Sequence, residues 1–139
     1  MPQTVNEVMT SDPRTVEPDQ PVAEAARSMR EGDVGALVVV QEGRATGIVT
    51  DRDIVLRAVA DDKDPGALRV ADVASVATVT VTPDQPATEA VRLMREHDVR
   101  RLVVVQDGRP AGIVSLGDLA VALDDSSALA DLSSAAPNN

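Results

Sequence analysis

Hydrophobic residues at helical spacing set the first pattern along the chain. A segment that begins after Pro21 carries apolar residues on one helical face, and Gly32 ends it, so we expect a helix that runs to Glu31. The residues of this face are Val22, Ala25, Ala26 and Met29. A later helix is expected from Asp51, and its inward residues are expected to be Ile54, Val55, Ala58 and Val59.

Continuous apolar runs between these helices predict strands. Residues 35–40 form an aliphatic run that is typical of a strand buried on both faces. Residues 41–44 have turn chemistry with a glycine, and residues 47–50 then predict the second strand of a hairpin. A brief strand is expected at 14–17. Thr4 and Glu7 have the spacing of a capping box, which predicts one short helical turn near the N-terminus.

The whole pattern then occurs a second time. Moving the sequence by 65 positions aligns residues 5–58 with 70–123 without a gap, and 27 of the 54 aligned positions are identical. The chain is therefore a tandem duplication of one unit of helices and strands. We expect the first motif at 5–60, a charged linker at 61–69, the second motif at 70–123, and a polar, partly disordered tail at 124–139.

A hydroxyl residue followed three positions later by Asp stands at the start of the last helix of each repeat. The two pairs are Thr50 with Asp53 and Ser115 with Asp118. One interpretation is structural: each pair forms a capping box for the first amides of its helix. The other is that hydroxyl, amides and carboxylate face a ligand that carries a phosphate and a ribose diol. The pairs alone leave both interpretations open.

Composition and charge narrow the function classes. The 139 residues include no Phe, Tyr or Trp, so base stacking on aromatic side chains is excluded. The net charge is −10, which argues against nucleic-acid binding and makes a local arginine cluster necessary for a phosphorylated ligand. Cys is absent and His97 is the one histidine, so we expect no metal site and no catalytic residue. No apolar run approaches the length of a membrane helix, and we expect a cytoplasmic protein without a membrane partner.

The repeated unit resembles the CBS domain. The resemblance rests on an aliphatic triplet, a turn, Gly-Ile-Val, Thr or Ser, two residues and Asp, and it covers residues 5–123. Two such units in tandem resemble a Bateman module of the stand-alone bacterial type. The resemblance implies an α+β fold (α/β-like) with pseudo-two-fold symmetry, in which small three-stranded sheets pack with two helices each. It also implies a homodimer, a disc of four CBS motifs.

In the CBS family, clefts between the two lobes bind adenosine nucleotides or S-adenosylmethionine. The resemblance implies a first set of ligand-binding residues: Thr10, Arg14, Val34, Ile48, Thr50, Asp53, Arg100 and Arg101. It implies a second, weaker set: Ser75, Val79, Gly35, Ala36, Val99, Ile113, Ser115 and Asp118. In the first set, Asp53 would accept hydrogen bonds from the ribose, and the two arginines would pair with phosphate. The second set lacks their charge, so we expect it to suit an uncharged adenosine moiety or no ligand.

These expectations describe a regulatory or sensor protein that performs no chemistry and requires no cofactor. AMP, ADP, ATP or S-adenosylmethionine would bridge the repeats, shift their conformational equilibrium and so signal to an unknown protein partner. The alternative is a ligand-free scaffold of the same fold that serves dimerisation or partner docking. The sequence leaves open which adenosyl ligand is bound and how the dimer is arranged. Without the family resemblance, Arg100 and Arg101 are better explained as solvated residues before a strand.

Overall fold

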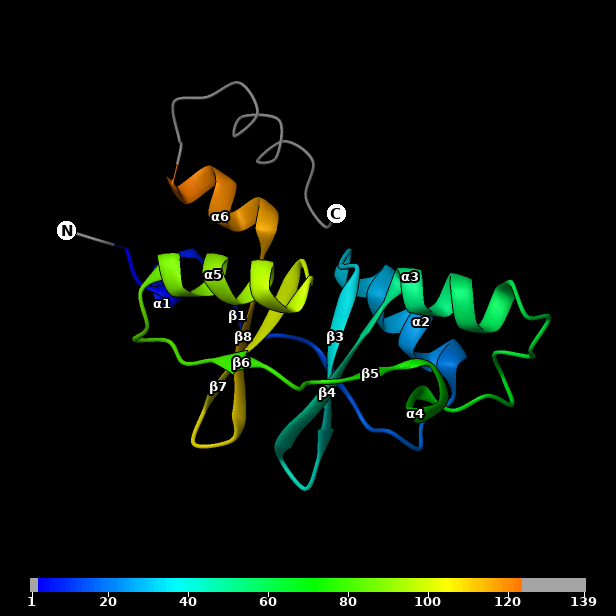
Figure 1. Ribbon diagram of the computed structural model, residues 1–139. Helices are drawn as coiled ribbons and strands as arrows, with labels where there is room; N and C mark the ends of the chain where they lie inside the picture. The colour runs from blue at the N-terminus through cyan, green and yellow to red at the C-terminus, as the bar shows by residue number, and fades with distance from the viewer. Residues whose placement is uncertain (1–2, 124–139) are drawn as a thin grey trace. The chain divides into compact units, whose positions relative to one another are not determined.

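The computed structural model describes residues 3–123, and the tail expected at 124–139 lies outside the described residues. Short helices and strands alternate through this range, which confirms the α+β class (Figure 1). The elements of the first repeat are α1 (Val5–Val8), β1 (Thr10–Ser11), β2 (Thr15–Val16), α2 (Val22–Gly32), β3 (Ala36–Gln41), β4 (Arg44–Thr50), α3 (Asp51–Ile54) and η1 (Val55–Val59). Those of the second are α4 (Val70–Val73), β5 (Ser75–Val76), β6 (Thr80–Val81), α5 (Ala87–His97), β7 (Arg101–Gln106), β8 (Arg109–Ser115) and α6 (Leu116–Leu123).

Two compact units make up the structure, and each contains one sheet. The first unit spans Arg14–Thr78 and holds the sheet of order β2-β3-β4-β5. The second unit combines residues 3–13 with residues 79–123 and holds the sheet of order β1-β8-β7-β6. In each sheet an antiparallel hairpin lies in the middle, and one short strand joins it in parallel. Each sheet has four strands, so the prediction of three was wrong by one strand.

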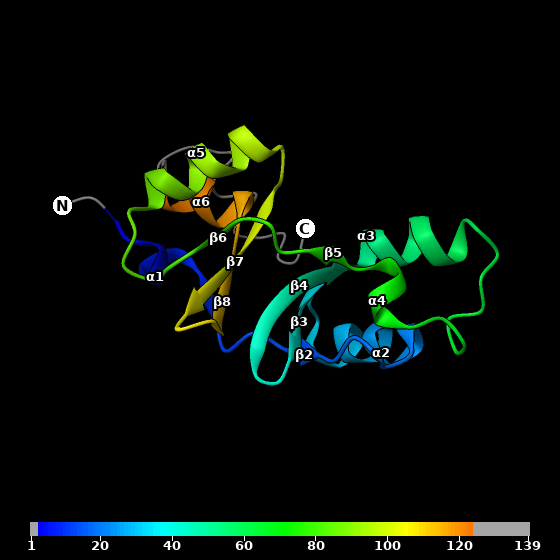
Figure 2. The ribbon, with the colours of Figure 1, turned by 60° about the horizontal axis from the view of Figure 1, so that its bottom comes forward.

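The additional strand of each sheet comes from the other sequence repeat. Strand β5 pairs with β4, with Gly47 opposite Val76, and β1 pairs with β8, with Gly112 opposite Ser11. Figure 2 shows β5 running beside β4 in the first unit. We call residues 3–13 and 64–78 the leader segments. We call the rest of each repeat, residues 14–63 and 79–123, its body. Each leader segment packs on the body of the other repeat, so the compact units differ from the sequence repeats.

Backbone hydrogen bonds fix the leader segments in place. The amide of Val70 donates to the carbonyl of Gln20 at 2.8 Å, and the amide of Val5 donates to that of Gln85 at 2.8 Å. Helix α2 begins after Pro21, which has no capping side chain, and the amide of Val22 donates to Leu68 of the leader at 2.8 Å. Leader carbonyls therefore satisfy a helix start that the local sequence leaves uncapped.

The hairpins form as the sequence predicts. The loop of the β3–β4 hairpin is Glu42-Gly43, and both residues have positive φ, 55° and 80°. The β7–β8 loop, Asp107-Gly108, has the same pair of values. Two positive φ values define the type I′ turn, whose twist matches that of the flanking strands.

Each unit has its own aliphatic core on the helix-covered face of its sheet. The first core contains Val16, Val22, Ala25, Met29, Leu37, Val39, Val49, Ile54, Ala58, Val70 and Val73. The second contains Val5, Val81, Ala87, Ala90, Met94, Leu102, Val104, Val114 and Leu119. Val38 points to the other face of β3 and is also fully buried, which confirms the prediction of a strand buried on both faces.

Three residues predicted to face inward are exposed. Ala26 lies at the margin of the buried stripe of α2, which is formed by Val22, Ala25 and Met29 only. Val55 and Val59 are 53 % and 60 % exposed. They lie in η1, a π-helical turn in which the Ala60 amide donates to the Val55 carbonyl at 2.8 Å. Ile54 and Ala58, each one position earlier and also four residues apart, are buried, so the buried stripe of this helix is narrower than predicted.

Candidate functional site

The first corner is the junction where β4 ends at Thr50 and α3 begins. The Thr50 hydroxyl accepts a hydrogen bond from the Asp53 amide at 3.1 Å, and the Thr50 amide donates to Asp53 Oδ2 at 2.9 Å. The Asp51 amide donates to the Gly35 carbonyl at 3.0 Å, and the Arg52 amide to Asp51 Oδ1 at 2.8 Å. The capping interpretation is therefore confirmed here. The first amides of α3 therefore already have acceptors, and the cap uses one of the two Asp53 carboxylate oxygens.

Asp53 also has a cationic neighbour. Its Oδ1 lies 3.9 Å from Nη1 of Arg57, one helical turn along the chain. The same Nη1 donates to the Val73 carbonyl in α4 at 2.8 Å. The Asp53 side chain is 15 % exposed and that of Arg57 51 %. One carboxylate oxygen therefore serves the cap, and the other faces a guanidinium that the leader segment holds.

The second corner is the equivalent junction of β8 and α6. The Ser115 amide donates to Asp118 Oδ2 at 2.9 Å, and the Asp118 amide donates to the Ser115 hydroxyl at 3.0 Å. The Leu116 amide donates to the Arg100 carbonyl at 2.9 Å. Ala122 stands at the position equivalent to Arg57, and within residues 3–123 no ion pair involves Asp118. The two corners share their capping geometry and differ in charge.

Strand pairing distributes the predicted site residues over the two units. Of the first predicted set, the first unit contains Arg14, Val34, Ile48, Thr50 and Asp53. The second unit contains Thr10, Arg100 and Arg101 of that set, together with Val79, Val99, Ile113, Ser115 and Asp118 of the second set. Gly35, Ala36 and Ser75, which were assigned to the second set, lie in the first unit.

The exchange of leader segments changes the neighbours of two predicted residues. Ser75 was assigned to the second set, but it lies opposite Ile48 of the first. Thr10 was assigned to the first set, but it lies opposite Ile113 of the second. The sequence gives no indication of this exchange, since each leader precedes its own repeat along the chain.

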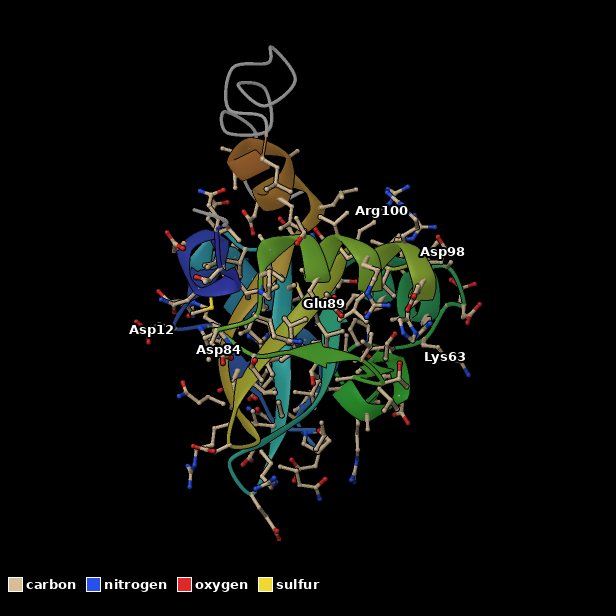
Figure 3. The ribbon with its side chains drawn as sticks, turned by 60° about the vertical axis from the view of Figure 1, so that its left-hand side comes forward. Asp12, Lys63, Asp84, Glu89, Asp98 and Arg100 are labelled. Atoms are coloured by element: carbon tan, nitrogen blue, oxygen red, sulfur yellow. The ribbon has the colours of Figure 1, made fainter. Side chains whose placement is uncertain are left out.

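Ala36 and Arg101 are the first residues of the central strands β3 and β7, and each lies opposite the hydroxyl residue of its own unit. Ala36 lies opposite Thr50 in the β3–β4 register, and Arg101 lies opposite Ser115 in the β7–β8 register. Arg100 is exposed and Arg101 half-buried. Figure 3 shows Arg100 close to Asp98 at the carboxyl end of α5. The second corner therefore has arginine beside its hydroxyl within one unit, and the first has alanine.

Arg14 contacts residues of β3 and α2 within the first unit. Its carbonyl accepts from the Val38 amide at 3.0 Å, and its Nη1 lies 3.4 Å from the Ser28 hydroxyl and 3.9 Å from Glu31. Its side chain lies over Gly32, where an added Cβ would come within 2.3 Å of Nε. Val34 packs against the first core, and Val79, the equivalent of Arg14, packs against the second.

Two features of the corners were not predicted. Arg57 was not singled out, although its i, i+4 spacing from Asp53 is the signal that indicates an ion pair on a helix. Gly47 and Gly112 were read only as part of a motif. An added Cβ at Gly47 would lie 2.6 Å from the Ser75 carbonyl oxygen, and one at Gly112 would lie 2.7 Å from that of Thr10. Each glycine thus allows a leader strand to approach its corner.

Two kinds of feature are absent from residues 3–123. None of the helices between residues 3 and 123 has both the length and the hydrophobicity of a membrane span. In the same range, no three His, Asp or Glu side chains gather in a way that would hold a metal ion.

Two copies of one α+β unit, each with a hydroxyl–acid corner at a strand–helix junction, define the class of protein: a tandem repeat module. The family model described as the CBS domain matches residues 5–60 and 70–125. The chain therefore belongs to the CBS domain family.

Two proteins are similar to this chain over most of its length and most of their own. The CBS domain-containing protein YhcV of Bacillus subtilis is 42 % identical over 118 residues, which cover 85 % of this chain and 84 % of that protein. Hypoxic response protein 1 of Mycobacterium tuberculosis is 33 % identical over 118 residues, 84 % of this chain and 82 % of that protein.

Solved structures confirm the fold. The crystal structure of Hypoxic Response Protein I with two coordinated zinc ions gives a TM-score of 0.75 at 33 % identity, and covers 85 % of this chain and 97 % of that one. The CBS domain pair of protein MJ0100, in complex with 5′-methylthioadenosine and S-adenosyl-L-methionine, gives a TM-score of 0.81 at 23 % identity, and covers 91 % and 100 %.

Proposed function

We propose that this CBS pair is a regulatory protein that binds an adenosyl ligand, either an adenosine nucleotide or S-adenosylmethionine. The observation that carries the proposal is the carboxylate of each corner. Asp53 and Asp118 each use one oxygen for the helix cap, so the other remains to accept hydrogen bonds from a ribose diol. The MJ0100 pair supports the proposal at the level of the fold, since that fold was solved with two adenosyl compounds.

The proposed roles of the other residues follow the family resemblance. Thr50 and Ser115 contact the ribose or a phosphate, Ile48 and Ile113 provide aliphatic surface, and Arg100 and Arg101 bind phosphate. Guanidinium groups suit this last role because their paired donors match phosphate oxygens. In this proposal the protein acts in the cytoplasm, performs no chemistry and needs no cofactor. The bound ligand changes its conformational equilibrium, and a partner protein responds.

A thermal-shift screen with AMP, ADP, ATP and S-adenosylmethionine tests the proposal. The unfolding signal must come from a dye, because the chain has no Trp or Tyr. A ligand at about 100 times its dissociation constant should stabilise the fold by about 2.7 kcal/mol. The matched control carries both Asp53→Asn and Asp118→Asn, which keep a cap acceptor and lose the carboxylate. If none of the four compounds raises the melting temperature, or the control responds equally, the ligand proposal is rejected.

A second proposal, homodimerisation, rests on an exposed apolar surface. Val55, Leu56 and Val59, here called the η1 surface, lie within η1 and are 53 %, 47 % and 60 % exposed. Arg52 stands at one end of this surface, and Asp61 and Asp62 at the other. In a two-fold pair with antiparallel helices, the arginine of one copy faces the acidic end of the other, which offsets the repulsion from the net charge of −10.

The oligomeric state tests this second proposal. Leu56→Arg should convert a dimer to a monomer in sedimentation equilibrium, because it places like charges at the centre of the two-fold contact. Val76→Arg is the matched control, since Val76 is exposed but lies on β5, away from η1 in the sequence. A wild-type monomer, or a Leu56→Arg dimer, would contradict the proposal. If the η1 surface dimerises and no adenosyl compound binds, the scaffold alternative is the better account.

A further inference from the structure

The geometry of the two corners points to Arg57 as the residue that determines which corner binds a neutral adenosyl ligand. Arg57 withholds Asp53 from the ribose diol, so Asp118 is the stronger diol acceptor of the chain. This inference rests on the proposed function and deepens it. It assigns a specificity role to a side chain that lies outside the hydroxyl–acid motif.

The Arg57 guanidinium lies beside the carboxylate oxygen of Asp53 that the cap does not use. Nη1 of Arg57 lies 3.9 Å from Oδ1 of Asp53, while Oδ2 accepts from the Thr50 amide. The diol would therefore have to use the oxygen that faces the cation. A neutral ligand offers no charge in exchange, so it must weaken an existing electrostatic contact in order to bind.

A hydrogen bond to the backbone of α4 holds the Arg57 side chain in place. Its Nη1 donates to the Val73 carbonyl at 2.8 Å, and Val73 is fully buried in the core of the first unit. The guanidinium is thus held between α4 and Asp53. Moving it away from the carboxylate costs the hydrogen bond to the leader segment as well as the ion pair.

The second repeat lacks this cation. The equivalent of Arg57 is Ala122, whose side chain ends at Cβ and carries no donor. The cap of Asp118 is otherwise the same, with bonds of 2.9 and 3.0 Å against 2.9 and 3.1 Å at Asp53. The carboxylates thus have the same cap and differ in the cation at the position of Arg57. Arg101, which lies opposite Ser115 in the β7–β8 register, is unchanged in every variant compared below.

The expected size of the effect is modest. Arg57 is half exposed, and an exposed ion pair changes an equilibrium by at most about fivefold. Adenosine is the appropriate probe, since it carries the diol and no phosphate and so reports on the carboxylate alone. We expect two unequal sites for adenosine, the tighter one at Asp118.

Single-site backgrounds make the test direct. In Asp118→Asn protein, which retains the first corner, the further change Arg57→Met should tighten adenosine binding by up to about fivefold, as measured by calorimetry. In Asp53→Asn protein, which retains the second corner, Ala122→Arg should weaken it by a similar factor. Both effects should shrink as salt is raised from low concentration to about 1 M, because partly exposed charges are screened. A merely structural role for Arg57 predicts no such salt dependence.

The outcomes separate this inference from the proposed function. If Arg57→Met leaves adenosine binding unchanged or weakens it, the inference is overturned. The proposed function still stands in that case, because adenosine binds. The same conclusion follows if Asp53→Asn removes the tighter site and Asp118→Asn leaves it. If neither adenosine nor AMP binds the wild-type chain, the proposed function fails and the inference fails with it. Should Arg57→Met lower the melting temperature sharply, the Ala122→Arg arm still decides, because it leaves the Val73 contact intact.

Discussion

Gly47 and Gly112 occur at the same place in both repeats, and their role depends on residues about 30 and 100 positions away, a separation that no local pattern reports. A Cβ at Gly47 would meet the Ser75 carbonyl oxygen at 2.6 Å, and one at Gly112 would meet Met9 Sδ at 2.6 Å. The sequence identifies these glycines as repeated, but only the docked leader segments explain them. The hydroxyl–acid pairs are the opposite case, because a capping box is local and its spacing predicts its bonds.

Replacing Gly47 or Gly112 by alanine should destabilise the protein. The added methyl group overlaps backbone of a leader strand, and overpacking of this kind costs about 1–3 kcal/mol. Chemical denaturation of each variant measures the loss. Gly66→Ala is the matched control, since its Cβ would find only the Asp64 side chain, at 3.4 Å. Equal stability of all three variants would show that the glycines do not serve leader docking.

Arg101→Ala should weaken AMP binding and spare adenosine. If the guanidinium binds phosphate, its loss removes a charge-assisted hydrogen bond, which corresponds to about tenfold or more in dissociation constant. Calorimetry with both compounds separates phosphate from diol recognition. Arg109→Ala removes the same charge from the β7–β8 hairpin and serves as the control. An unchanged AMP affinity in Arg101→Ala would remove this residue from the site.

The helices and hairpins are the elements that periodicity and turn chemistry predict well. Helix α2 begins and ends within one residue of expectation, and the loops at Glu42-Gly43 and Asp107-Gly108 follow from their glycines. The prediction of the last helix of the first repeat was wrong at Val55 and Val59. Helical periodicity correctly places Ile54 and Ala58 on the buried face, but it does not show how wide that face is when the neighbouring residues are also apolar.

Helix α1 gives a prediction of pH dependence. The Thr4 amide and hydroxyl lie 3.0 and 3.1 Å from Glu7 Oε1, and their hydrogen bonds lower the pKa of Glu7 below its ordinary value of 4.5. A lowered folded-state pKa contributes stability above the unfolded value, and this contribution is lost as pH falls through the folded value.

Glu7→Gln should therefore be less stable than the wild type at pH 7, and the difference should diminish below about pH 4.5. Urea denaturation of both proteins at pH 7 and at about pH 3 measures it. Because Glu7 is on the surface, the difference is expected to be small. A difference that stays constant with pH would show that the capping carboxylate does not titrate in this way.

At the level of the whole chain, the exchange of leader segments decides how the duplication becomes two compact units. The sequence shows two repeats, and it cannot show which repeat each leader segment packs on, because the two repeats are similar in sequence. Half of the aligned positions are identical, so the docking surfaces present similar apolar residues to either leader. Strands β1 and β5 have two residues each, too few for period-two alternation to reveal them.

Deleting residues 1–13 should therefore destabilise the repeat that is distant in sequence. The deletion removes Val5, which is fully buried in the core of the second unit, together with the β1 pairing. Hydrogen exchange should speed up in residues 79–123 and stay slow in residues 14–78, which keep their own leader segment. The reverse pattern, with loss of protection in residues 14–60, would show that each leader docks on its own repeat.

The most direct test of the ligand proposal is a crystal structure of the protein grown with AMP. The account predicts the ribose hydroxyls within hydrogen-bond distance of the Asp53 or Asp118 carboxylate oxygen that the cap leaves available. A nucleotide bound elsewhere, or corners that remain without nucleotide at saturating AMP while the fold is unchanged, would contradict it.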